Sequence, residues 1–258
     1  MTSRNGGSSL QSEWPELERR IRARTSARLM QGRVGGCYRT LTQLDLREAH
    51  AAARDAVRTE LDIQKQFGED MIRQWGLFEV STQAQNKDDY LLHPNLGRTF
   101  SDSSRDELAK RCSQRNDLQI AIGDGLSVTA VAAQVPKLLP ALCERAAARG
   151  LTVGQTFVVR HCRVGILNHI GEILQPAVAV LLIGERPGLA TPESLSAYMA
   201  YRPHSGQTDA DRNLVSNIHP RGIGIPGAAD RILNLAAQMM RAKCGGIPLA
   251  VATARLQE

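Results

Sequence analysis

Short apolar runs alternate with amphipathic stretches in the second half of the chain. Three runs have the length of strands, Leu118–Ile122, Phe157–Arg160 and Ala177–Ile183, and the last is apolar without interruption. Unbroken apolar runs of this length, bounded by turn-forming residues, are typical of buried parallel strands. Val164–Leu174 lies between the last two runs and has the length of a helical crossover. From residue 117 onward, the alternation predicts an α/β fold: a Rossmann-like, mostly parallel sheet with flanking helices.

Helix signals complete this half. Ser127 can cap a helix that Pro136 is expected to break, and a second helix then runs to Gly150. Thr191–Ser194 combines a capping residue with a following proline, which predicts the start of a short helix. The last helix is marked by an apolar stripe at helical spacing, made of Ile232, Leu235, Ala236, Met239 and Met240.

The N-terminal region follows a helical pattern. Residues 1–12 are polar and rich in Gly and Ser, so we expect them to be disordered. Two helices should follow, separated by the flexible turn Gly32–Gly36. The second carries a buried stripe on which His50 should be a packed core histidine; its members are Leu46, His50, Ala53, Val57 and Leu61.

A further helix should end at Trp75–Gly76. Leu77–Ser81 and Asp89–Leu92 then predict a small hairpin around a polar turn, and Ser101–Arg115 a helix. We therefore expect two regions: residues 1–100, mainly helical with a hairpin, and residues 101–258, the α/β domain.

Composition excludes several classes of protein. No apolar run in the 258 residues approaches the roughly 18 needed to span a bilayer, and the N-terminus has no secretory signal. The five cysteines are odd in number and widely spread, which indicates reduced thiols in a cytoplasmic protein.

Positive charge is concentrated near the N-terminus. The chain has a net charge of +6, and eight arginines against one acid, Asp45, lie between Arg19 and Arg47. Such a segment is either a basic face for nucleic acid or another anionic partner, or a helix that faces solvent or another subunit. Only Tyr38 could stack on bases there, so nucleic acid is the less favoured partner.

Familiar catalytic and metal-binding motifs are missing. Gly123-Asp124-Gly125 begins like a dinucleotide fingerprint, but Val128 stands where the third glycine belongs. The chain has no Walker A sequence, C-x-x-C, H-E-x-x-H or G-x-S-x-G, nor the D-x-H-x-x-G pattern of some cobalamin enzymes. The amides of the turn and Asp124 could still bind polar groups of a ligand. No catalytic residue and no metal ligand is therefore predicted.

Glu185 is the most informative charged residue. It follows the apolar run Ala177–Ile183 within a Gly/Pro-rich turn, so it should lie at the edge of the sheet where ligands bind in α/β folds. A carboxylate only accepts hydrogen bonds, which suits a ligand rich in N–H donors. The alternative is an ion pair with Arg186 or Arg212. Farther on, Arg202–Ile225 has little periodicity apart from a short strand at Val215–Ile218, as in functional or disordered loops.

A series of motifs, matching in order and spacing from about Thr25 to Gly246, resembles the small (light) subunit of ethanolamine ammonia-lyase. The motifs are Thr25-Ser26-Ala27-Arg28, Gly32-Arg33-Val34-Gly35, His50–Val57, Leu96-Gly97-Arg98, Asp124-Gly125-Leu126-Ser127, Ile170-Gly171-Glu172, Gly184–Leu189, Ser194-Leu195-Ser196-x-Tyr198, Asp209–Asn213 and Ser216-Asn217-Ile218.

The resemblance implies an ammonia-lyase, a carbon–nitrogen lyase, in which this chain is a non-autonomous subunit. Enzymes of this family use adenosylcobalamin to convert ethanolamine to acetaldehyde and ammonia by radical chemistry. The large subunit holds the substrate and the small subunit closes over the cofactor. The family's cobalamin contacts correspond to Val164, Glu185 and Leu214 here, with leucine at a position where the family commonly has cysteine.

Two further expectations concern partners and location. The resemblance implies a hetero-oligomer with the large subunit; the alternative is a stand-alone basic module that binds nucleic acid or another anionic partner. We expect a cytoplasmic protein, with a bacterial microcompartment as the other location, although residues 1–12 show no helical apolar stripe of the kind found in longer leaders.

Overall fold

The structure, a computed structural model, describes residues 9–24, 29, 31–188 and 191–255. A six-stranded sheet forms its centre, with the spatial order β3-β5-β4-β6-β7-β8. The strands are β3 Glu79–Ser81, β4 Leu118–Gly123, β5 Phe157–Arg160, β6 Val178–Gly184, β7 Leu195–Tyr201 and β8 Arg212–Ile218. The pairings from β3 to β6 are parallel, and β7 and β8 are each antiparallel to the preceding strand. The predicted α/β fold with a mostly parallel sheet is confirmed.

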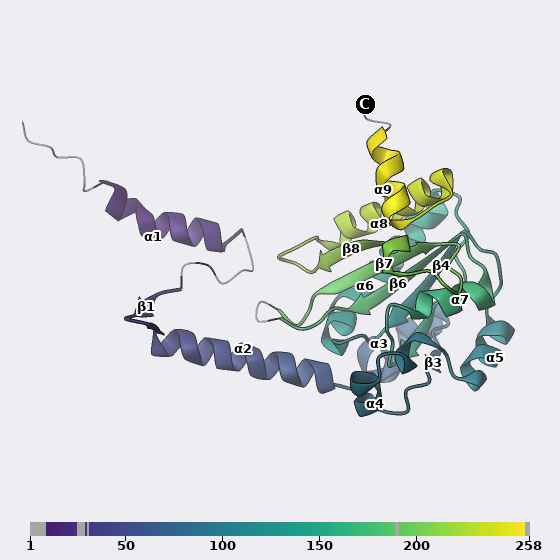
Figure 1. The fold of residues 1–258 in the computed structure, drawn as a ribbon, viewed down its shortest axis with the longest axis horizontal. Coiled ribbons are helices and arrows are strands. Elements are labelled where there is room, and N and C mark those ends of the chain that lie inside the picture. The colour runs from purple at the N-terminus through teal and green to yellow at the C-terminus, as the bar shows by residue number, and fades with distance from the viewer. Residues whose placement is uncertain (1–8, 25–28, 30, 189–190, 256–258) are drawn as a thin grey trace, which may run out of the picture.

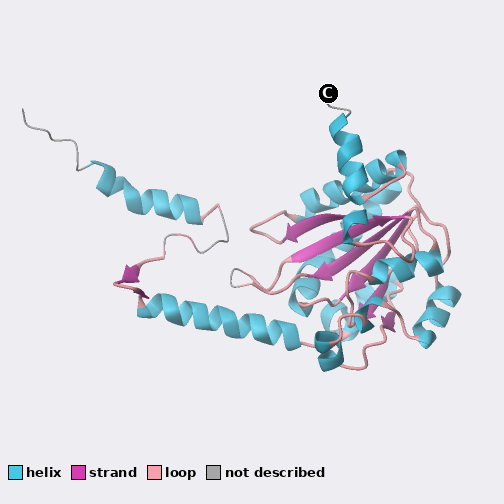
Figure 2. Cartoon of the chain, viewed as in Figure 1, coloured by secondary structure: helices cyan, strands magenta, loops and turns pink. Residues whose placement is uncertain are grey.

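Helices cover both faces of this sheet (Figures 1 and 2). The described helices are α1 Ser9–Arg22, α2 Thr40–Arg58, α3 Ile63–Trp75, α4 Lys87–Leu92, α5 Asp102–Arg111, α6 Val128–Ala148, α7 Ile166–Leu174, α8 Ile225–Ala242 and α9 Gly246–Arg255, with short 3-10 turns η1 Leu96–Arg98 and η2 Asp209–Asp211. α3, α6 and α8 pack on one face, and α5 and α7 pack on the other.

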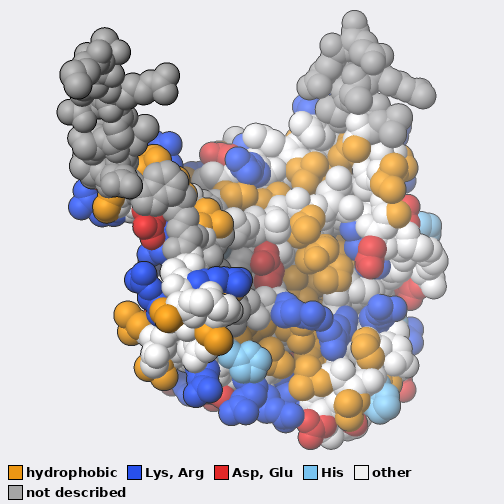
Figure 3. Space-filling model, turned by 60° about the vertical axis from the view of Figure 1, so that its left-hand side comes forward, with side chains coloured by type: hydrophobic (Ala, Val, Ile, Leu, Met, Phe, Trp, Pro, Cys, Tyr) orange, Lys and Arg blue, Asp and Glu red, His pale blue; other side chains and the backbone are white. Residues whose placement is uncertain are grey.

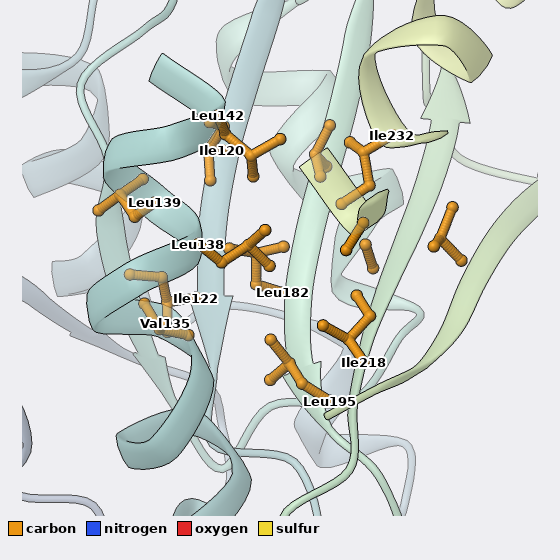
Figure 4. Packing of buried hydrophobic residues seen from close by; sticks show 14 of the residues in the cluster. Ile120, Ile122, Val135, Leu138, Leu139, Leu142, Leu182, Leu195, Ile218 and Ile232 are labelled. Atoms are coloured by element: carbon orange, nitrogen blue, oxygen red, sulfur yellow. The ribbon is translucent and has the colours of Figure 1, made fainter. Parts of the chain in front are cut away.

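The larger core cluster lies between the sheet and helices α6 and α8 (Figure 4). Alternate residues of β4, such as Ile120 and Ile122, point toward Leu138 and Leu142 of α6. Alternation of side chains across a strand sends the intervening residue, Ala121, into the second cluster on the other face. Because both faces are covered, β4, β5 and β6 are mostly apolar, with Gln119 and Arg160 as the polar exceptions.

Helix α6 corrects one prediction. It continues through Pro136 and Pro140 instead of ending at the first proline. A proline inside a helix costs about 3 kcal/mol, because it removes a hydrogen bond and crowds the preceding turn. Nine residues of α6 are buried. Since a fully buried aliphatic side chain contributes about 1.5–3 kcal/mol, this packing outweighs the two interruptions.

The predicted hairpin of residues 77–92 is wrong. Glu79–Ser81 forms β3, but it pairs in parallel with β5. Residues 87–92 form helix α4, because the side chain of Asn86 accepts a hydrogen bond from the amide of Asp89 and caps it. A two-stranded antiparallel pair occurs earlier instead, between β1 Arg33–Val34 and β2 Cys37–Tyr38.

The helix predicted from Thr191–Ser194 is also wrong. The Thr191 hydroxyl accepts from the amide of Glu193 in a local turn, and the chain then enters β7. The strand predicted at Val215–Ile218 is confirmed within the longer β8.

An N-terminal arm, residues 9–58, contains α1, the β1–β2 pair and α2, and it stands beside the α/β body (Figure 1). Prediction of disorder for residues 1–12 is wrong for residues 9–12, which are helical, and residues 1–8 lie outside the described residues. Only Ala56 of α2 is buried, and His50 is exposed rather than packed in a core. Among the arm's described side chains, the exposed large apolar ones are Leu17, Leu29, Val34, Tyr38, Leu41 and Leu44.

The division near residue 100 stays a prediction, and β3, on its N-terminal side, is hydrogen-bonded into the same sheet as the later strands. Over the described part of the chain, no helix combines the length and apolar character required to cross a bilayer.

Candidate functional site

Three loops meet at the carboxyl ends of β4, β5 and β6. The chain leaves β4 for β5 on one side and later reaches β6 on the other, so this edge contains the point where strand order reverses. Ligands of open α/β sheets bind at such points. A hollow of about 350 Å³ opens there, and we call it the rim pocket. Its wall includes Leu126 after β4, Val164 after β5 and Glu185 after β6, together with Tyr198 of β7 and Leu214 of β8.

Two glycines allow the loops after β4 and β6 to touch. Gly125 has a φ of +59°, and a Cβ there would lie 2.3 Å from the carbonyl oxygen of Gly184. A Cβ on Gly184 would lie 2.0 Å from the carbonyl oxygen of Ser127. Since any side chain would push these backbones apart, both glycines are required for the close contact that forms this side of the rim pocket.

Asp124 points inward and does not reach a ligand position. It is fully buried, and its carboxylate accepts from the amides of His161 at 2.9 Å and Cys162 at 2.7 Å. The buried ammonium of Lys87 lies 3.8 Å away. Burial raises the pKa of Asp124, whereas Lys87 and the two amides favour its charged form. Asp124 therefore fastens the loop after β5 to the loop after β4.

Glu185 is held by hydrogen bonds and not by an ion pair. Its carboxylate accepts from the hydroxyl of Ser194 at 2.7 Å, the hydroxyl of Ser196 at 2.5 Å and the amide of Asn217 at 2.9 Å. Within the described residues it pairs with neither Arg186 nor Arg212; Arg212 pairs with Asp209 instead. A carboxylate has about four acceptor sites, so one remains on Glu185 for a ligand.

The three residues predicted as cofactor contacts all lie on the rim pocket. Val164 is half-buried in the turn before α7, and Leu214 of β8 is 46% exposed. Leu214 pairs with Tyr198, which is half-buried. Burial raises the pKa of the Tyr198 phenol, and the nearby Glu185 carboxylate raises it further. The phenol is therefore a neutral hydroxyl beside the acid.

Tyr90 and Arg163 also line the rim pocket. The guanidinium carbon of Arg163 lies 4.1 Å from the centre of the Tyr90 ring, and its Nη2 donates to the Tyr90 carbonyl at 2.8 Å. The buried Tyr90 hydroxyl donates to the carbonyl of Cys162 at 3.1 Å. α4 thereby anchors the loop that carries Val164. The sequence did not predict this anchoring role, because residues 89–92 were assigned to a hairpin.

The donors to Glu185 were also missed. Ser194, Ser196 and Tyr198 alternate along β7 and the residue before it, which places their side chains on one face of the strand. That spacing of two could have indicated a polar row beside the predicted acid. Asn217 could not have been found, because its contribution is a backbone amide set by a left-handed φ of +62°.

Chemically, the rim pocket combines an aliphatic wall with one carboxylate, a neutral phenol and two arginines, Arg163 and Arg186. Among the described residues, no cluster of three or more His, Cys, Asp or Glu side chains could hold a metal ion. The aliphatic wall can contact apolar groups of a ligand, and the free acceptor site of Glu185 can receive a hydrogen-bond donor.

Comparison with known proteins gives one consistent result. Residues 15–250 match the sequence model of a family described as ethanolamine ammonia-lyase light chain (EutC). The chain is 39% identical over 229 residues to the ethanolamine ammonia-lyase small subunit of Clostridium perfringens, covering 89% of this chain and 76% of that protein. The small subunit of Clostridioides difficile gives the same figures. That of Clostridium acetobutylicum is 38% identical over 231 residues, or 90% of this chain and 93% of that protein.

Proposed function

The chain belongs to the ethanolamine ammonia-lyase light-chain family, and we propose that it closes over adenosylcobalamin at the rim pocket, against a large catalytic subunit. The assembled enzyme would convert ethanolamine to acetaldehyde and ammonia. The observation that carries this proposal is that Val164, Glu185 and Leu214, which come from three separate segments, line one hollow at the carboxyl edge of the sheet.

The chemistry of the pocket fits the cofactor. A corrinoid is an apolar macrocycle with amides around its edge, so it requires aliphatic contact and scattered acceptors. Leu126, Val164, Ile183 and Leu214 supply the aliphatic contact, and the free acceptor site of Glu185 can receive an amide N–H. Leucine at position 214 provides an apolar contact and no thiol.

The size of the pocket supports the need for a partner. Pockets that bury drug-sized ligands measure about 300–1,000 Å³. The rim pocket holds about 350 Å³, so a corrinoid would project well beyond it. A second protein surface must cover the remainder of the cofactor to exclude water from it.

Radical chemistry, begun by homolysis of a cobalt–carbon bond, is what adenosylcobalamin supplies when bound. The tasks of this chain are to bind, orient and shield. Ser194, Ser196 and the amide of Asn217 fix the direction of the Glu185 carboxylate before the ligand arrives, so little side-chain freedom is lost on binding.

We also propose that the arm of this chain is a second surface that contacts the large subunit. Six of its large apolar side chains are exposed, and residues 9–58 carry ten arginines against six acids. Hydrophobic and basic side chains gather on the arm and on the neighbouring face of the body (Figure 3). Such a surface requires an apolar partner with acidic groups around it.

The test is cofactor binding by the reconstituted complex of the two subunits. Replacing Glu185 with alanine should weaken adenosylcobalamin binding about tenfold, as expected for about 1–3 kcal/mol from one buried hydrogen bond to a charged group. Affinity is measured by titration of the corrinoid absorbance. The exposed Glu144 of α6 provides the control, and Glu144→Ala should bind normally. Unchanged affinity in Glu185→Ala would refute the assignment.

A second measurement concerns the subunit role. The purified chain should show no deaminating activity alone, and activity should appear only when both the large subunit and adenosylcobalamin are added. Activity of the isolated chain would contradict the proposal.

A further inference from the structure

The arm joins the body through residues 59–62, between the end of α2 and the start of α3, and we call this segment the joint (Figure 1). Leu61 of the joint is 2% exposed and belongs to the larger core cluster. Next to it, the carboxylate of Glu60 lies 3.2 Å from Nε2 of His161, a residue of the body. A segment with one anchored side chain can pivot, and a second anchor fixes its direction. Glu60 is that second anchor.

The other contacts that orient α2 are modest. α2 packs against α6, but Ala56 is the one buried residue that the structure describes in it. The ion pair between Arg58 and Asp88 is exposed, with side chains that are 67% and 71% accessible. Exposed ion pairs contribute little to stability. The contact between Glu60 and His161 therefore has a large share in setting the direction in which the arm leaves the body.

His161 is 5% exposed, and both of its ring nitrogens face acceptors. Nδ1 lies 3.1 Å from the carbonyl oxygen of Ala84, which only accepts, so Nδ1 must carry a proton. Nε2 faces the carboxylate of Glu60, so a second proton must lie between these two groups. Carboxylic acids ordinarily lose their proton near about pH 4.3 and histidine near about pH 6.5, so the second proton belongs to the ring. The contact is an imidazolium paired with a carboxylate.

Charged groups from several elements surround this imidazolium. The amide of His161 donates to the carboxylate of Asp124 at 2.9 Å, and the ring stacks on Tyr90 with centroids 6.0 Å apart. The titratable and charged side chains of the cluster are Glu60 of the joint, Glu79 of β3, Lys87 and Tyr90 of α4, Asp124 after β4 and Arg160 of β5. They include three carboxylates and two cations, so a positive charge on the ring balances the cluster.

Loss of the second proton breaks the contact. The lone pair of Nε2 then faces a carboxylate oxygen, and neither atom has a hydrogen to donate. Arg160 does not replace the lost bond, because its Nη2 lies 3.6 Å from Glu60, beyond hydrogen-bond distance, and its Nη1 pairs with Glu79. The ring cannot follow Glu60, since Nδ1 stays bonded to Ala84 and the backbone amide to Asp124. The joint is then held by Leu61 alone of its two anchors.

We propose that the joint is a pH-dependent hinge, in which the imidazolium of His161 holds Glu60 and fixes the direction of the arm. Histidine is the side chain whose charge ordinarily changes near neutral pH. When the ring becomes neutral, α2 pivots about Leu61 and the arm takes up a range of directions. Binding of a partner to the arm becomes weaker at that pH, because the arm must be ordered again on binding. The hinge follows from contacts within this chain and requires neither a cofactor nor a second subunit.

The experiment uses the free full-length chain between about pH 5.5 and about pH 8.5, the range in which histidine titrates. Nitrogen NMR of protein with isotope-labelled histidine reports the proton on each ring nitrogen, and the variant His161→Asn identifies the signals of His161. Spin labels on the exposed Cys37 of the arm and on Leu92→Cys, at an exposed position of α4, report the distance between arm and body. Cys143→Ala and Cys244→Ala keep these two half-buried thiols from being labelled.

Both ring nitrogens of His161 should carry a proton at low pH, and the distribution of distances should then be narrow. The distribution should widen about twofold at the pH where Nε2 loses its proton, so that the two transitions coincide. His161→Asn should give the wide distribution at every pH, because asparagine tolerates the left-handed φ of +55° at this position but does not reach Glu60.

Glu60→Gln should remove the pH dependence and keep the distribution narrow. Its amide can accept from the charged ring and donate to the neutral ring, so the contact survives the loss of the proton. Glu69→Gln, at an exposed acid of α3, is the matched control and should behave as the unaltered chain does. Circular dichroism at each pH establishes that a wide distribution does not result from unfolding.

Three results would overturn the proposal. In the first, His161 loses its proton and the distribution of distances stays the same, so the contact does not orient the arm. In the second, Nε2 carries no proton anywhere in the pH range, so the ring is not an imidazolium. In the third, Glu69→Gln removes the pH dependence as well as Glu60→Gln does, so the effect comes from overall charge and not from the joint.

Discussion

Helix α2 of the arm and helix α6 of the body have similar lengths, 19 and 21 residues, but they bury different amounts of surface. α6 has nine buried residues and packs against the sheet and against α8, even though it contains two prolines. α2 has one buried residue, and its Leu41 is 71% exposed. Burial keeps α6 helical against its local sequence, whereas α2 forms with little help from tertiary contacts.

The difference in burial between α2 and α6 shows which helices are stabilised by packing within this chain. Isolated helices are marginal in water, and most helical stability in proteins comes from packing of an apolar face. The body provides that packing within one chain, and none of the arm's described residues belongs to its core clusters. Under the proposed function, the large subunit would give the apolar side chains of the arm the same stabilisation.

The largest expected effect is on the free energy of unfolding, and it is seen by making the same Leu→Ala change separately in each helix. Leu139→Ala in α6 should lower the free energy of unfolding by about 2–5 kcal/mol, because Leu139 is fully buried and the change leaves a cavity. Leu44→Ala in α2, at a side chain that is 54% exposed, should change it by less than about 0.5 kcal/mol. Urea unfolding of the free chain measures both. Similar losses would mean that α2 is packed in the free chain.

Charge on the arm should affect assembly and leave folding intact. Leu41→Asp combined with Leu44→Asp should weaken binding to the large subunit by about 100-fold, or about 2.7 kcal/mol, since two apolar contacts are replaced by charges. Binding is measured by calorimetry. Leu92→Asp is the control, because Leu92 is 74% exposed on the body, and it should bind within a factor of two of the unaltered chain. If the arm variant and Leu92→Asp weakened binding equally, the arm would not be part of the interface.

The smallest effect separates two histidines. His169 of α7 accepts from the amide of Phe100 through Nδ1, and burial together with Arg105 lowers its pKa. The pKa of His169 in the folded chain therefore lies below its unfolded value of about 6.5. Neutral His169 then stabilises the fold fully above pH 6.5, and this stabilisation is lost as the pH falls through the folded pKa. His169→Asn should lessen the drop in melting temperature between pH 7.5 and 5.5. His50→Asn, on the exposed arm, should leave that drop unchanged; an equal change in both would contradict the comparison.

Much of the body could be predicted because its strands are buried on both faces. Ala177–Ile183 is apolar along its whole length, and Leu118–Ile122 and Phe157–Arg160 contain one polar residue each, Gln119 and Arg160, so the strands can be recognised whatever the turns between them. The errors fall where tertiary contacts override local signals. Pro136 lies inside a helix because of core packing, and Thr191–Ser194 is not helical because the Ser194 hydroxyl donates to Glu185 just before the chain enters β7.

The site could be predicted in part. Glu185 was identified because it follows a buried strand, but its partners lie 9, 11 and 32 residues away in sequence. Patterns within one helix or strand do not show which residues so far apart in the sequence will be hydrogen-bonded to each other. His50 was wrongly placed in the core because helical spacing shows that a helix has an apolar face but does not show which molecule covers it.

The separation of the arm from the rim pocket along one covalent chain has a thermodynamic consequence. Two modest contacts that share a backbone act together, since formation of one raises the effective concentration of the other, often to the millimolar range. Under the proposed function, release of the cofactor from the rim pocket would leave the arm bound to the large subunit, so the two subunits would stay together while the cofactor is replaced.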